Sequence, residues 1–227
     1  MLANNIANTS APGFKSDREF YNLYSSTEAA GAPPGTAPEQ LPLIERQWTD
    51  FSQGSLTPTG NPLDLALNGK GFFVAKSPAG PVYTRNGSFQ LSPSGRLETG
   101  DGYAVEGQDG QPIVVDISKP VEIDADGTVR QDGQDVAKLA VVGFRDTSAL
   151  SKRGSSYFQT DLSTMPPVPT AEAEIQQGKI EAANSQPAES AVRLVNVLRQ
   201  FESLQKALTI GSEMNRQVIE EVAKVTS

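Results

Sequence analysis

Histidine and cysteine are both absent from the 227 residues of this sequence. Without histidine there is no Ser-His or Cys-His nucleophile, no imidazole metal ligand and no imidazole proton transfer. Without cysteine there is no disulfide and no thiolate metal site. An enzyme of this composition would have to use carboxylates, lysine, tyrosine or a cofactor. We therefore expect a protein that performs no chemistry, with no catalytic residue, no cofactor and no metal site.

Three further features are missing. No apolar run reaches the length of about 18 residues that a transmembrane helix needs, so no membrane span is predicted. The N-terminus has no basic start followed by an apolar core, so we expect no cleavable signal peptide. The net charge is −8 and no basic patch stands out, which argues against nucleic-acid binding.

The strongest periodic pattern lies at the C-terminal end, where residues 187–227 read as one long helix. Apolar residues recur there at alternating steps of four and three, the spacing of a coiled-coil seam, and Gly211 and Asn215 interrupt it. A helix of this length with one apolar stripe needs a partner. We predict that the stripe is a subunit interface formed by Leu194, Val197, Leu198, Phe201, Leu204, Leu208, Val218 and Val222.

Between residues 43 and 161 the apolar period changes to two. In the stretch 63–67, leucine alternates with Asp64 and Ala66, and glycine-containing turns separate many short strands. This pattern is typical of an all-β module of the barrel or sandwich type. The apolar run 136–144 is the best candidate for its central strand.

The predicted fold class is α+β, with this all-β module inserted between terminal helical segments. The chain begins with what reads as the end of an N-terminal helix, because Asn8-Thr9-Ser10 and Pro12-Gly13 stop the pattern that starts at Leu2. Two stretches rich in proline and alanine are predicted to be linkers. The five predicted segments are the helix end and following segment 1–24, the linker 25–42, the β-rich domain 43–161, the linker 162–186 and the C-terminal coiled-coil-type helix 187–227.

Aspartates provide candidates for chemistry. The stretch 124–128, Asp-Ala-Asp-Gly-Thr, resembles the start of a calcium loop, but it lacks the remaining ligands in register, so we interpret it as a hairpin turn. Asp132, Asp135 and Asp146 could contribute to a glycosidase-type carboxylate pair, whose separation the sequence does not give. A secreted β-rich carbohydrate-active enzyme or binding module therefore remains the alternative function.

Three stretches, in order along the chain, carry a more specific signal. The first contains the runs 4–9 (Asn-Asn-Ile-Ala-Asn-Thr) and 13–15 (Gly-Phe-Lys), and the second runs from residue 53 to residue 89. The third contains 177–184 and the run Arg-Gln-Phe-Glu at 199–202. Together they resemble the bacterial flagellar axial proteins of the rod and hook, over nearly the whole chain. The motif residues are Asn4, Asn5, Asn8, Gly13, Phe14, Gly60, Asn61, Leu63, Asp64, Gly69, Gly71, Phe72, Gly178, Glu181 and Asn184.

The resemblance implies a structural subunit of the flagellar basal-body rod, the polymeric drive shaft needed for motility. The terminal helices of such proteins form a coiled coil, and the proteins have no catalytic site and no cofactor. The implied partners are copies of the chain, other flagellar axial proteins and the flagellar export apparatus, with no nucleic acid and no small-molecule substrate. The implied location is the periplasmic rod of the basal body, reached without a cleaved signal peptide.

Within the family, the Arg-Gln-Phe-Glu run and the modest β-region most resemble proximal rod proteins; distal rod proteins come second, and a hook component is a further alternative. Members carry a longer helix before the Asn-Asn motif, whereas this sequence starts inside the motif region at Met1. The resemblance therefore implies that most of the first helical arm is missing, through a start assigned too late or a shortened form. We expect the turn 2–8 to be the remainder of the helix that partners the C-terminal seam.

Overall fold

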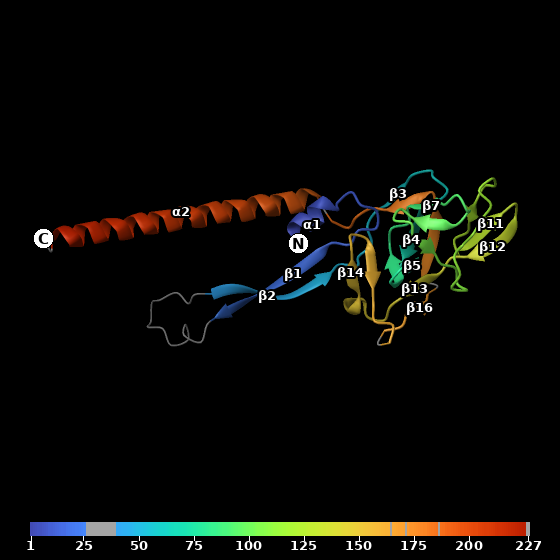
Figure 1. Cartoon of the computed structure of the whole chain (residues 1–227), viewed down its shortest axis with the longest axis horizontal. Coiled ribbons are helices and arrows are strands. Elements are labelled where there is room, and N and C mark those ends of the chain that lie inside the picture. The colour runs from blue at the N-terminus through green and yellow to red at the C-terminus, as the bar shows by residue number, and fades with distance from the viewer. Residues whose placement is uncertain (26–39, 164, 171, 186, 226–227) are drawn as a thin grey trace. The chain divides into compact units, whose positions relative to one another are not determined.

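A computed structural model describes residues 1–25, 40–163, 165–170, 172–185 and 187–225 (Figure 1). The chain divides into two compact units. The first, residues 3–185, is rich in strands, and we call it the β unit. The second, residues 186–227, consists of the C-terminal helix, and we call it the helical unit.

The N-terminal part of the chain contains a short helix and a long hairpin. Helix α1 (Leu2–Ala7) ends where the sequence predicts, at the Asn8 cap. Strands β1 (Asp17–Ser25) and β2 (Gln40–Thr49) then pair antiparallel along their full lengths, with a bulge after Phe20.

The predicted linker 25–42 is wrong where it overlaps this hairpin. Ser25 pairs with Gln40, and Leu23 pairs with Pro42, so both ends of the predicted linker belong to the ladder. The pairing is between segments distant in sequence, which composition alone does not reveal. The rest of that linker, residues 26–39, lies outside the described residues.

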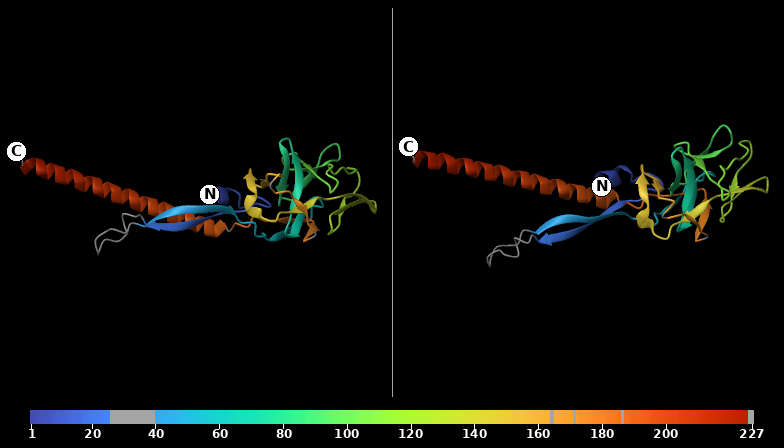
Figure 2. Two further views of the ribbon diagram at one scale, coloured as in Figure 1. Left: turned by 90° about the horizontal axis from the view of Figure 1, so that it is seen from below. Right: turned by 60° about the horizontal axis from the view of Figure 1, so that its bottom comes forward.

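The largest sheet is antiparallel and lies at the centre of the β unit (Figure 2). Its strand order is β14-β15-β6-β5-β9-β8-β7, and β13 joins it by pairing with β5 on one side and β16 on the other. The bounds are β5 (Phe72–Ser77), β6 (Gly80–Thr84), β7 (Phe89–Leu91), β8 (Leu97–Thr99), β9 (Ala104–Val105), β13 (Val141–Gly143), β14 (Ser151–Arg153), β15 (Tyr157–Gln159) and β16 (Val168–Pro169).

Smaller ladders complete the β unit. Strand β4 (Leu65–Gly69) pairs with β17 (Ala173–Gln177), and β3 (Leu56–Pro58) pairs with β18 (Lys179–Glu181). A three-stranded sheet contains β10 (Glu122–Ile123), β11 (Thr128–Gln131) and β12 (Gln134–Lys138). A short 3-10 helix, η2 (Thr147–Ala149), precedes β14.

The strands β16, β17 and β18 fall inside the stretch 162–186, so the prediction of a linker there is wrong. These strands form because distant strands offer them backbone partners, and Ile175 of β17 is buried in the core. The predicted central strand 136–144 is also wrong. It divides into β12 and β13, which belong to different sheets, and Leu139 between them bridges to Gly107.

Buried apolar side chains from many of these strands and the loops between them form the core of the β unit. The main cluster consists of Leu65, Leu67, Phe73, Phe89, Leu97, Val105, Ile113, Val115, Val121, Ile123, Val129, Leu139, Val141 and Ile175. A second cluster contains a group of aromatic rings: Phe72 and Phe158 contact each other edge to face, and Phe51 contacts both. The alternating leucines at 63–67 contribute to the main cluster, as their period-two pattern predicts.

Helix α2 (Pro187–Val225) makes up the helical unit, as the periodic pattern predicts for residues 187–225. Residues 226–227 lie outside the described residues. Among the described helices, none combines the length and the apolar character needed to cross a membrane.

Candidate functional site

The predicted interface residues of α2 present a stripe of solvent-exposed apolar side chains. Phe201 is 57% exposed, Leu204 is 64% exposed and Leu208 is 75% exposed. Leu194, Val197 and Leu198 are also exposed, and all six lie along one side of the helix at 3.6 residues per turn. We call these six residues the α2 stripe. Large exposed apolar patches mark surfaces that bind other molecules.

The side chains of Val218 and Val222, the other two predicted interface residues, lie outside the described residues. Their place in the stripe stays a prediction, as does coiled-coil pairing of α2.

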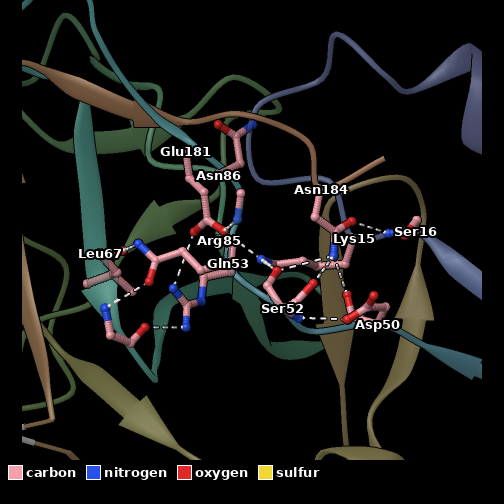
Figure 3. Close-up of polar contacts among 12 residues, drawn as sticks. Lys15, Ser16, Asp50, Ser52, Gln53, Leu67, Arg85, Asn86, Glu181 and Asn184 are labelled. Atoms are coloured by element: carbon pink, nitrogen blue, oxygen red, sulfur yellow. Dashed lines mark hydrogen bonds and ion pairs between the residues drawn. The ribbon is translucent and has the colours of Figure 1, made fainter. Parts of the chain in front are cut away.

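Two of the motif residues, Glu181 and Asn184, belong to a buried polar cluster in the β unit (Figure 3). At its centre, Glu181 at the end of β18 has a fully buried side chain. One carboxylate oxygen, Oε1, accepts hydrogen bonds from Lys15 Nζ at 2.5 Å and from the Gly54 N–H at 2.9 Å. The other, Oε2, accepts from Arg85 Nη1 at 3.2 Å. A single carboxylate therefore joins three segments that are far apart in sequence.

Backbone carbonyls accept further hydrogen bonds from the two cations, while Arg85 Nε is buried without a hydrogen-bond partner among the described residues. Lys15 Nζ also donates to Ser52 O at 2.6 Å, and Arg85 Nη2 donates to Gly69 O at 2.7 Å. Burial lowers the pKa of Lys15 and of Arg85, and the charge and hydrogen bonds of Glu181 oppose that effect. Burying an ion pair away from water is costly. Removing one partner of a buried pair costs more, because it leaves the other charge uncompensated. The cluster therefore holds one arrangement of these segments.

Two asparagines of the motifs hold the N-terminal segment within the β unit. Asn184 Oδ1 accepts from the Ser16 N–H at 2.7 Å, while its Nδ2 donates to Asp50 O at 2.6 Å. Asn5 forms a pair of bonds with Asp17, accepting from its N–H at 3.0 Å and donating to its carbonyl at 2.9 Å. Each side-chain amide provides a hydrogen-bond partner for backbone groups that a neighbouring strand would otherwise satisfy.

Gln53 extends the cluster to the edge of β4. Its Nε2 donates to Leu67 O at 3.1 Å, and its Oε1 accepts from the Gly69 N–H at 3.1 Å. The sequence-based list of site residues lacks Lys15, Gln53 and Arg85, although all three lie in the stretches that carry the resemblance. The signal for them was a charged or amide residue within or beside each motif: Gly-Phe-Lys, Gln-Gly and Thr-Arg-Asn-Gly.

Close backbone packing explains two glycines at this cluster. An added Cβ at Gly54 would lie 1.9 Å from Ala182 O. At Gly13, φ is 67° and an added Cβ would lie 2.2 Å from Asn86 N. Any side chain at either position would push apart the segments that Glu181 joins. Phe14, the motif residue beside Gly13, is fully buried, and Lys152 Nζ lies 4.7 Å from its ring centroid.

The other motif residues form turns and core contacts outside the cluster. Gly60 donates to Gly178 O at 3.2 Å, Asn61 Oδ1 accepts from Leu63 N–H, and Asp64 O accepts from the Gly178 N–H at 2.8 Å. Asn8 Nδ2 donates to Asn4 O at the end of α1. Gly71 and Phe72 lie at the start of β5, where the Phe72 ring joins the aromatic core. These residues hold backbone turns and core contacts.

The acidic candidates are occupied by structural partners. Gly127, with φ of 89°, forms the turn between β10 and β11, and Asp126 accepts from the Thr128 N–H and pairs with Lys138 at 2.7 Å. Asp132 pairs with Lys119, Asp135 pairs with Arg130, and Asp146 caps η2 through the Ser148 N–H. Within the described ranges, no three acidic side chains gather in a way that could hold a metal ion.

Comparison with known proteins agrees with this distribution of motifs. A model described as "Flagellar hook protein FlgE/F/G D1 domain" matches residues 66–131, and one described as "Flagellar basal body rod FlgEFG protein C-terminal" matches residues 176–221. The flagellar basal-body rod protein FlgF of Caulobacter vibrioides is 34% identical over 226 residues, which cover 99% of this chain and 91% of that protein. The chain belongs to the flagellar basal-body rod protein family. The resemblance inferred from the three motifs is thereby confirmed.

Other relatives in this rod family carry the name FlgG. FlgG of Buchnera aphidicola (subspecies Schizaphis graminum) is 30% identical, with 94% of this chain and 90% of that protein covered. FlgG of Bacillus subtilis is 29% identical, with 96% of this chain and 91% of that protein covered. The higher identity to the Caulobacter FlgF agrees with the expected likeness to proximal rod proteins. The C-terminal match includes both Glu181 and the α2 stripe.

Proposed function

We propose that this chain, a structural subunit of the flagellar basal-body rod, joins the rod by burying the α2 stripe against the terminal helices of neighbouring axial subunits. The observation that supports this is the exposure of six large apolar side chains along one side of α2. Burying each Leu, Val or Phe stabilises the contact by roughly 1.5–3 kcal/mol. A heptad-like spacing is the pattern that lets such side chains interlock with another helix as a coiled coil. Val218 and Val222 continue the seam in this proposal.

The mechanical role follows from repetition of that contact. The partners are copies of this chain and other flagellar axial proteins of the rod and hook, and the rod transmits torque through many such helix contacts. In this proposal the subunit acts in the periplasmic part of the basal body. It is delivered there by the flagellar export apparatus without a cleaved signal peptide, and it has no catalytic activity, cofactor, nucleic acid or small-molecule substrate.

We place the subunit in the proximal rod, because its identity to a FlgF exceeds its identity to the FlgG relatives described above. Quantitative mass spectrometry of basal bodies purified with successively longer axial structures tests this position. A proximal subunit is present before the distal rod and hook are complete, whereas a distal or hook component appears only with those later structures.

Phe201→Asp and Leu204→Asp test the proposed interface. Each variant places a charge on the α2 stripe, and a buried unpaired charge costs far more than the contact contributes. We expect loss of the subunit from purified basal bodies and loss of swimming, while the β unit keeps its thermal unfolding midpoint. Immunoblots of basal bodies, motility plates and differential scanning calorimetry provide the measurements.

Ser203→Asp is the matched control for these variants. It adds the same charge to the same helix, but Ser203 lies about 200° around the helix from Phe201 at 3.6 residues per turn. We expect this variant to be incorporated and to swim. Normal rods and swimming in the Phe201→Asp strain would contradict the proposed interface.

A further inference from the structure

The buried polar cluster has an uneven charge balance. Lys15 and Glu181 have fully buried side chains, and the side chain of Arg85 is 5% exposed. Two cations therefore share one carboxylate, and one positive charge is in excess when all three groups are ionised. Isolated charges in such surroundings carry a penalty that only close opposite charges and hydrogen bonds offset. Glu181 is the group of the three that offsets both cations.

The segments that meet at Glu181 come from distant parts of the β unit. Lys15, within the segment 13–17, lies 166 positions before Glu181 in the sequence, and Arg85 lies 96 positions before it. The docking of residues 13–17 also uses acceptors near β18, because the Gly13 N–H donates to Glu181 O at 2.7 Å and the Ser16 N–H donates to Asn184 Oδ1. If β18 were not in place, Lys15 would lose its carboxylate and Gly13 and Ser16 would lose their acceptors.

We propose that Glu181 is a closing residue, which makes the docking of residues 13–17 conditional on the pairing of β18 with β3. The segments that lead to the two terminal helices then become ordered together or not at all. Residues 13–17 follow α1, and Asn184 precedes the first residue of α2 by only a few positions. This coupling goes beyond the proposed assembly interface, because it concerns the order of the β unit itself and does not require the α2 stripe.

Hydrogen exchange of the full chain, followed by mass spectrometry or NMR, reads this coupling at named amides. Glu181→Gln retains the shape of the side chain but removes the charge, which leaves two buried cations uncompensated. We expect protection at Gly13 and Ser16 to fall by roughly 100-fold, together with protection in β18, because breaking one side of a buried pair is strongly destabilising. Amides of β5 and β6, in the large sheet, should keep protection close to that of the unmodified chain.

A double variant separates this coupling from simple loss of a structural contact. Lys15→Met removes one of the two cations, so Lys15→Met combined with Glu181→Gln leaves one buried cation, Arg85, without a carboxylate, whereas Glu181→Gln alone leaves two. We expect the double variant to recover part of the protection at Ser16 that Glu181→Gln alone loses. Two independent structural losses would instead add, and the double variant would be less protected than either single variant.

Glu174→Gln is the matched control, since Glu174 is exposed on the neighbouring strand β17 and the substitution removes the same charge. We expect no change at Gly13 or Ser16. The proposal is overturned if Glu181→Gln loosens β18 but leaves residues 13–17 protected. It is also overturned if the double variant is no better than Glu181→Gln alone. If Glu181→Gln does not fold, recovery of folding in the double variant supports the proposal and its absence overturns it.

Discussion

Gly13 illustrates how a single residue decides whether the N-terminal segment can pack against the backbone that follows β6. Its φ of 67° is unfavourable for residues with a Cβ, and its backbone packs directly against the peptide between Arg85 and Asn86. The free-energy cost of the positive φ can be measured apart from the cost of the clash. Gly110 has a similar φ of 74°, with nothing within 4 Å of an added Cβ.

Gly13→Ala should therefore destabilise the β unit much more than Gly110→Ala. The left-handed backbone costs an alanine about 1–2 kcal/mol at either position. At Gly13 the contact at 2.2 Å with Asn86 N adds a clash with backbone that cannot rotate away. Urea unfolding of both variants measures the difference. Equal midpoints for the two variants would mean that the segment around residue 13 can move away from β6 without cost.

Asn5→Ala should loosen the contact between α1 and the start of β1. The substitution removes both hydrogen bonds to Asp17, and lost bonds to partly buried groups cost about 1–3 kcal/mol. We expect the Asp17 amide to exchange roughly tenfold faster or more. Asn4→Ala, at an exposed position in the same helix, is the matched control and should leave that amide unchanged. An equal effect of both variants would assign the change to helix propensity rather than to the Asn5 bonds.

The sequence motifs indicate which residues hold the β unit together, but not which residues they contact. The third motif points to Glu181 and Asn184, and the first points to Gly13. Their meeting depends on contacts across more than a hundred positions, and no local pattern encodes such contacts. Lys15 and Arg85 were missed as site residues because a single lysine or arginine in a sequence is more often a solvated surface charge.

The aromatic cluster links several elements of the β unit. Phe158 of β15 is fully buried and contacts Phe51 and Phe72 edge to face, with ring centroids 5.0 Å and 5.7 Å apart. Phe158→Ala should lower the free energy of unfolding of the β unit by about 3–5 kcal/mol, because it leaves a cavity that these rings cannot fill. Chemical denaturation followed by intrinsic fluorescence measures this loss.

Phe201→Ala is the control for Phe158→Ala. It makes the same substitution in α2, where Phe201 is 57% exposed, so little burial is lost in the single chain. We expect the unfolding of the β unit to be unchanged. A similar loss of stability in both variants would show that the two units unfold as one.

Elements with a clear period were predicted well, and elements that depend on distant partners were not. The alternating leucines predict β4, the Asp-Gly turn predicts the β10–β11 hairpin, and the apolar stripe predicts α2. Strands β17 and β18 were missed, since their sequences are polar and follow a proline-rich stretch. They are strands because β4 and β3, more than a hundred residues earlier, present unpaired edges to them.

In the proposed function, the α2 stripe connects the single chain to the polymer. A helix of 39 residues whose apolar side chains remain in water gains little from packing, and most helix stability in proteins comes from packing an apolar face. Partners that bind the helical form stabilise it by mass action. The helical content of α2 should therefore depend on the concentration of subunits, whereas the β unit, with its own core, should not.

Circular dichroism at increasing protein concentration tests this dependence. We expect the helical signal to rise with concentration in step with self-association measured by sedimentation velocity, because association buries the α2 stripe. Leu208→Asp should abolish both changes, since it places a charge at the most exposed residue of the stripe. Ser203→Asp should behave like the unmodified chain. A helical signal that is high and constant at every concentration, with no loss in Leu208→Asp, would show that α2 is stable without a partner, and the stripe would then need another explanation than assembly.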